Sequence, residues 1–209
     1  NTTYSGVMSG TGALVKQGSG ALTMSGANTY SGATTINAGQ IIIENDAPSF
    51  STSGFSGAGS LVIQPSSTSF TSAYTFNKTI TSLGSLTIGK SGNTADITIG
   101  AAQTVNGAIN LYGGNVNINA SLNTAGGTTA GDVLIKASGD ISLAAAKSIT
   151  TSGGDVILWS DSDASNAGTI SLLDGSSIST SGGHIWMGGG NASGTAWNGL
   201  TVGDGYAMA

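Results

Sequence analysis

The sequence predicts an all-β protein, a parallel β-helix built from short strands with roughly 20–30 residues in each turn. The stretch Gly139–Trp159 is followed by a related stretch, Gly168–Gly188, and the two share 10 of 21 positions without a gap. Apolar residues inside both copies stand two apart, as in Ile141 and Leu143, which is the periodicity of a strand. Gly-Gly or Ser-Gly closes each strand, so the pattern indicates stacked turns that cannot bury their apolar faces alone.

Composition supports the same class and excludes several functions. The 209 residues include 35 Gly and no Cys, and charged residues make up 7%, against about 25% in an average soluble domain. Ten acidic residues stand against five Lys, and Arg is absent. The sequence therefore lacks the clustered cations that bind phosphate and the thiols that form disulfides or act as thiolates. It also lacks an apolar run of about 20 residues that could form a membrane helix.

The first repeating region spans residues 12–45 and carries short apolar strands with Gly or Asn at each corner. Its stretch GSGALTMSGANTYSGATTINAGQIIIEN, Gly18–Asn45, resembles the autotransporter-associated β-strand repeat of bacterial surface passengers. That resemblance implies turns of a right-handed parallel β-helix.

The segment 46–83 differs, because it holds both prolines and all four phenylalanines around one clear strand, SLVIQ. Proline is excluded from the interior of a paired ladder, so we expect longer loops that bulge from the stack. A boundary between subdomains is the alternative interpretation.

The regular pattern returns from residue 84 to the end. In GNVNINAS, alternation places Asn115, Asn117 and Asn119 outside and the intervening Val116, Ile118 and Ala120 inside. This part, at about 84–205, resembles the filamentous-haemagglutinin-like exoproteins of Gram-negative bacteria, which implies a secreted adhesin. We interpret residues 1–209 as a single β-helix segment of a larger protein, and no amphipathic helix that could cap its ends is visible.

One loop carries the strongest signal for a metal. Asp161, Asp163 and Asn166 present oxygen ligands at spacings that resemble the opening of a Ca²⁺ loop. However, Leu172 stands where a bidentate Glu is expected, and a turn rich in Asp, Ser and Asn explains the pattern equally well. Calcium is the only cofactor that the sequence indicates.

Three tryptophans, Trp159, Trp186 and Trp197, form a candidate interaction surface in the last quarter of the chain. Strand register turns Trp159 and Trp186 outward, where aromatic rings bind sugars or a protein partner. The alternative is a following loop, residues 191–197, that folds back over them.

Catalysis has little support in the sequence, although β-helices also host polysaccharide-active enzymes. Asp132, Asp140 and Asp155 each precede a strand, where a carboxylate caps a turn. His184 is the single histidine and is expected to point to solvent, since a metal site needs further ligands. No catalytic residue is assigned.

We therefore expect a non-catalytic stalk or adhesive segment of an extracellular or cell-surface bacterial adhesin. The expected partners are a receptor or glycan on a host or neighbouring cell, further turns of the same chain, and an outer-membrane secretion partner. The alternative is a fibre subunit that assembles end to end with copies of itself, and an enzyme is the third candidate.

Overall fold

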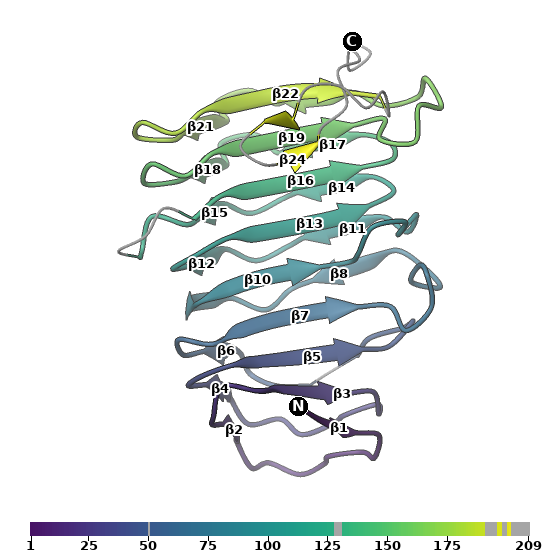
Figure 1. The fold of residues 1–209 in the computed structure, drawn as a ribbon, viewed down its shortest axis with the longest axis vertical. Helices are drawn as coiled ribbons and strands as arrows, with labels where there is room; N and C mark the ends of the chain where they lie inside the picture. The colour runs from purple at the N-terminus through teal and green to yellow at the C-terminus, as the bar shows by residue number, and fades with distance from the viewer. Residues whose placement is uncertain (50, 128–130, 191–195, 198–199, 202–209) are drawn as a thin grey trace.

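The computed structural model describes residues 1–49, 51–127, 131–190, 196–197 and 200–201. Strands in parallel sheets form a β-solenoid with about 23 residues per turn, so the predicted parallel β-helix is confirmed. Successive turns stack from β1 at one end to β22 at the other (Figure 1). The described residues contain no helix long and apolar enough to cross a membrane.

Three parallel sheets form the sides of the solenoid. In the described part, sheet A has nine strands, in the order β1 (Thr2–Tyr4), β3 (Ala21–Met24), β5 (Gln40–Glu44), β7 (Ser60–Gln64), β10 (Ser85–Ile88), β13 (Ile109–Gly113), β16 (Val133–Ala137), β19 (Val156–Ser160) and β22 (Ile185–Gly189). Sheet B contains β2 (Leu14–Lys16), β4 (Thr34–Ile36), β6 (Phe55–Ser56), β9 (Ile80–Leu83), β12 (Gln103–Val105), β15 (Leu122–Asn123), β18 (Ser148–Thr150) and β21 (Ser177–Ser179). Sheet C contains β8 (Tyr74–Phe76), β11 (Ile97–Ile99), β14 (Val116–Ile118), β17 (Ile141–Leu143) and β20 (Ile170–Leu172). A separate antiparallel pair joins β23 (Ala196–Trp197) to β24 (Leu200–Thr201).

The length of a turn changes where sheet C begins. Near the N-terminus the chain alternates between sheets A and B, and these short turns place Leu22 beside Ile41. From β7 onward a sheet C strand enters each turn, and the turns become longer, so that Leu86 lies beside Ile109. The turn that places Val156 beside Ile185 is longer again, because a loop of residues 161–169 separates β19 from β20. The irregular repeat length therefore reflects both the addition of a third side and the longer loop of the last described turn.

The stack continues through 46–83 without a break, since β5 pairs with β7 and β7 with β10. This segment contains β6, β7, β8 and β9, where the sequence indicates one strand. Phe55, Phe70 and Phe76 are buried, and the rings of Phe55 and Phe76 lie 6.3 Å apart between centroids. Strands β6, β8 and β9 are too short to show alternation, so the sequence could not reveal them. The division of the chain into three regions stays a prediction.

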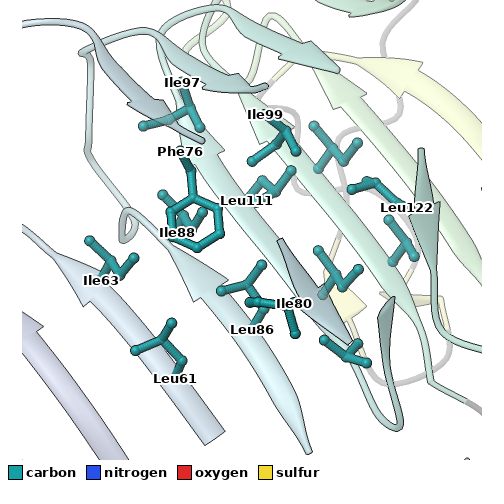
Figure 2. Packing of buried hydrophobic residues seen from close by; sticks show 14 of the residues in the cluster. Leu61, Ile63, Phe76, Ile80, Leu86, Ile88, Ile97, Ile99, Leu111 and Leu122 are labelled. Atoms are coloured by element: carbon teal, nitrogen blue, oxygen red, sulfur yellow. The ribbon is translucent and has the colours of Figure 1, made fainter. Parts of the chain in front are cut away.

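Inward side chains from the three sheets form one continuous core. Figure 2 shows side chains from several strands meeting in the narrow interior, and those of Leu86 and Ile97 are fully buried. Val116 and Ile118 are also buried, as their alternation with asparagines predicts, whereas Ala120 is half-buried. Because identical registers repeat from turn to turn, each side chain packs on its counterpart above and below.

The predicted register of the twin repeats is confirmed, but burial falls toward the last turn. Ile141 and Val156 are 1% and 0% exposed, while Ile185, which pairs with Val156, is 47% exposed. Ile170, which pairs with Ile141, is only half-buried. These residues lie on the last described turn of the stack, so their columns open to solvent there.

The shared Thr-Ser-Gly-Gly of the twin repeats builds the corner between sheets B and A. The Thr151 hydroxyl donates to the carbonyl of Gly154, and the Thr180 hydroxyl donates to that of Gly183. A Cβ added at Gly183 would collide with the carbonyl of Gly154 in the turn below. The threonine therefore satisfies a buried carbonyl, and the glycine permits the close stacking of backbones.

Polar side chains tie each turn to the next at the starts of the strands. At sheet C, Asp96 Oδ1 accepts from Asn115 N at 2.7 Å, Asn115 Oδ1 from Asp140 N at 2.8 Å, and Asp140 Oδ1 from Thr169 N at 2.8 Å. We call these four residues the sheet C relay. An equivalent sheet A relay runs from Asp132 to Asp155 and from Asp155 to His184, at 2.8 and 2.7 Å. The aspartates expected to cap turns therefore hold amides of the following turn instead.

Candidate functional site

The outer face of sheet A carries an apolar patch that is separate from the core. Leu134 of β16 and Ile157 of β19 point outward yet are only 8% and 0% exposed. Tyr112 of β13, Trp159 of β19 and Trp186 of β22 pack against them and are half-buried. We call these five residues the outer aromatic patch, and its position on four neighbouring strands follows from the register of sheet A.

Trp159 is fixed in this patch from two directions. Its indole Nε1 donates a hydrogen bond of 2.8 Å to the carbonyl of Gly190. The Lys136 ammonium lies 3.8 Å from the ring centroid, because the two residues pair across β16 and β19. One face of the indole is thus occupied by a cation, which disfavours free stacking on that face.

The three tryptophans that the sequence suggested as an interaction surface lie in different places. Trp159 and Trp186 share the outer aromatic patch, and both point outward as the register predicted. Trp197 belongs to β23, but its side chain lies outside what the structure describes. Residues 191–195 of the loop 191–197, which was expected as a cover, also lie outside the described residues.

Burial shifts the pKa of two polar groups beside the patch. Desolvation lowers the pKa of the Lys136 ammonium below its ordinary value. Desolvation also raises the pKa of the Tyr112 phenol. Both shifts disfavour the charged form, which places these two side chains in a less aqueous environment than the open surface.

A hollow of ≈ 180 Å³ adjoins the patch where strands of sheet A end. Tyr112 and Lys136 line it together with residues from the turns that follow β10, β16 and β19. We call it the lysine hollow, and the polar groups that matter here are Lys90, Tyr112, Lys136, Ser138, Ser162 and Asp163. It offers ammonium, hydroxyl and carboxylate groups beside one aromatic ring, which is a set suited to binding a small polar ligand.

The loop proposed for calcium is closed by its own hydrogen bonds. Asp161 is 5% exposed, and its Oδ1 accepts from Ser165 Oγ at 3.2 Å and from Asn166 N at 3.0 Å. Asp163 is exposed, and its Oδ1 accepts from Ser165 N at 3.2 Å. Asn166 is exposed and has a positive φ of 62°. In the described part of the chain no three His, Cys, Asp or Glu residues gather as a metal site would require, and the calcium hypothesis stays a prediction.

His184 ends the sheet A relay at the surface. Its side chain is 74% exposed, as expected, and Nδ1 lies 3.1 Å from Oδ1 of the buried Asp155. The same Asp155 oxygen accepts from the backbone N–H of His184. This pairing fixes the start of β22 over β19.

These features define a β-solenoid whose outer wall carries an aromatic patch and a small polar hollow. The family model described as Passenger-associated-transport-repeat matches residues 14–43, a repeat typical of autotransporter passengers. This match covers most of the stretch that resembled such a repeat. No curated protein and no solved structure matches the chain. The haemagglutinin-like resemblance of the later turns has no support from these comparisons and stays a prediction.

Sequence reasoning named the tryptophans but missed Tyr112, Leu134 and Lys136. A signal was present in VLIKA, residues 133–137, where Leu134 and Lys136 alternate with three inward residues. In the structure Leu134 is 8% exposed, so this outward apolar position belongs to a covered surface. The hollow itself depends on turns from several levels of the stack, so its assembly was not visible in the sequence.

Proposed function

We propose that this chain is a rigid, non-catalytic segment of a secreted or surface-exposed bacterial passenger, and that it carries an adhesive surface away from the cell. The observation that carries the proposal is the unbroken parallel ladder from β1 to β22, which begins with turns that match a passenger repeat.

The ladder suits a mechanical role. Nine strands at a spacing of about 4.8 Å give sheet A a length of roughly 40 Å along the stack. Backbone hydrogen bonds, the glycine corner and the two relays join every turn to its neighbours in the region from β10 onward. A stack of this kind resists local opening, because no turn can leave without breaking contacts on both sides.

The carboxylates support a structural role rather than catalysis. Four aspartates each accept a hydrogen bond through one carboxylate oxygen from a backbone N–H of the following turn: Asp96, Asp132, Asp140 and Asp155. A general acid or nucleophile must instead reach a substrate. The only paired titratable groups in the described structure are His184 and Asp155, and that carboxylate is already engaged with backbone.

The proposed partners are a receptor or glycan on a host or neighbouring cell, and an outer-membrane secretion partner that delivers the chain. The outer aromatic patch and the lysine hollow supply the contact surface. Aromatic rings beside polar groups favour both sugar and protein partners.

Display of the 209-residue chain on a non-adherent bacterium tests this function. We expect the displayed solenoid to resist protease added to the cells. We also expect the displaying cells to adhere to epithelial or bacterial cell layers more than cells that display an unrelated β-solenoid. Equal adherence of the two would contradict the adhesive role, and rapid proteolysis would contradict the rigid one.

A fibre subunit is the second candidate, supported by the apolar residues exposed on the last described turn. Leu172, Ile185 and Met187 are 44%, 47% and 43% exposed, although each continues an inward column. Sedimentation of the wild-type chain and the Ile185→Lys variant tests end-to-end assembly. Concentration-dependent association that the variant abolishes and Ser142→Lys retains would favour the fibre, and a monomer at every concentration would contradict it.

A further inference from the structure

The lysine hollow concentrates positive charge in an acidic chain. The protein has a formal charge of −5 and only five lysines, yet Lys90 and Lys136 line the same hollow. Asp163 is the single acidic side chain in its lining, so the local balance is positive. This arrangement favours an anionic ligand over a neutral or cationic one.

The two ammonium groups retain unused donors. Lys90 Nζ donates to the Pro65 carbonyl at 2.9 Å, and Lys136 Nζ lies over the Trp159 ring. Neither lysine forms a salt bridge in the part of the chain that the structure describes. Lys136 is partly desolvated, and a cation in that position gains from an anion that replaces lost water.

The rest of the lining fits the hydroxylated ring of a sugar. Tyr112 offers an aromatic ring, while Ser138, Ser162 and Asp163 offer hydroxyl and carboxylate oxygens that can bind ring hydroxyls. The volume of ≈ 180 Å³ is below the roughly 300–1,000 Å³ of pockets for drug-sized ligands. One sugar residue of a longer chain suits this size.

We propose that the lysine hollow binds an acidic saccharide residue, with its carboxylate between Lys90 and Lys136 and its ring against Tyr112. Asp163 accepts hydrogen bonds from the sugar hydroxyls and disfavours more highly charged anions such as phosphate. This inference rests on the proposed adhesive function and names the class of glycan that the surface recognises.

Calorimetry and saturation-transfer NMR on the full 209-residue chain test the site with trigalacturonate, its methyl ester and inorganic phosphate. We expect trigalacturonate to bind, and the methyl ester and phosphate to bind at least about tenfold more weakly, since an ionic hydrogen bond is lost or Asp163 opposes the added charge. Binding should weaken as salt is raised.

Variants locate the site. Lys136→Gln and Lys90→Gln should each reduce affinity about tenfold, Lys136→Arg should restore most of it, and Tyr112→Phe should retain it because the ring remains. Lys147→Gln is the matched control, since Lys147 lies outside the hollow and should leave affinity unchanged. Thermal melting of every variant confirms that the solenoid is intact.

Three results would overturn the inference: absence of trigalacturonate binding, equal affinity for the methyl ester, or unchanged affinity in both glutamine variants. Adherence of displaying cells that persists in excess trigalacturonate would also refute it while leaving the adhesive function standing. Absence of adherence despite specific trigalacturonate binding would instead remove the adhesive function alone.

Discussion

Replacement of Gly154 by Ala tests whether glycine sets the spacing between turns. A Cβ at this position would lie 2.6 Å from the carbonyl carbon of Gly131, closer still to its oxygen, and 3.1 Å from Asp132 N. All three atoms belong to the backbone of the turn below. A flexible side chain could move aside, but these atoms are held in the ladder, so β16 and β19 must separate locally.

The cost follows from the bonds at this corner. Overpacking alone costs about 1–3 kcal/mol. Separation also strains the 2.8 Å bond from Val133 N to Asp155 O and the 2.8 Å bond from Asp155 N to Asp132 Oδ1. Each such bond contributes about 1 kcal/mol net, so we expect the free energy of unfolding to fall by about 3–5 kcal/mol.

Urea denaturation followed by circular dichroism measures this change, with two matched controls. A Cβ at Gly54 would meet Thr79 O at 3.6 Å, an ordinary contact, and a Cβ at Gly12 would meet nothing within 4 Å. Both controls should be neutral or stabilising by a few tenths of a kcal/mol, because alanine reduces the freedom of the unfolded chain. The reasoning fails if Gly154→Ala unfolds at the same urea concentration as Gly54→Ala.

Further predictions concern the core, the loop and the outer wall. Ile141→Asp buries an unpaired charge and should lower the free energy of unfolding by about 3 kcal/mol or more in denaturation experiments. Ser142→Asp and Ile185→Asp should be nearly neutral, because those side chains reach solvent. Equal losses of stability at all three positions would show that the register is wrong. If the loop of Asp161, Asp163 and Asn166 binds calcium, millimolar Ca²⁺ should raise the melting temperature and Asp163→Ala should abolish the rise; no shift in the wild-type chain removes the calcium hypothesis. The Lys136 ammonium should titrate below the ordinary lysine pKa in NMR, since burial lowers its pKa. Its folded pKa then lies below its unfolded pKa, so stability should rise with pH between the two, and a midpoint at or above the ordinary value would contradict the desolvation argument.

Much of the fold was predictable because its determinants are local and repeat. The alternation of Ile141 with Leu143 gives the inward face, and the shared Thr-Ser-Gly-Gly gives the corner. Each recurrence of the pattern supplies another observation of how one turn is built. Where the pattern weakens, at 46–83, the same sheets continue but the sequence alone no longer shows them.

The candidate site was less predictable, because it depends on which turns meet. Alternation showed that Trp159 points outward, but not that Lys136 lies over its ring. That contact depends on the length of the turn between β16 and β19, and turn length varies along this chain. Tyr112 joins the same wall through a turn of another length. A local pattern shows which face of a strand a side chain occupies, whereas its neighbours on other strands depend on the length of every intervening loop.

The two relays give a direction to the part of the stack that runs from Asp96 onward. In both relays the lower turn supplies the oxygen and the upper turn supplies the N–H, so these hydrogen bonds point in a single direction along the axis. Neither relay reaches the N-terminal turns: the sheet C relay starts at Asp96 and the sheet A relay at Asp132, and they end on the last described turn at Thr169 and His184. A head-to-tail contact between copies would continue the parallel ladder, and it forms open polar filaments rather than closed two-fold dimers. Such a filament would have two different ends, so growth at one end could be distinguished from growth at the other.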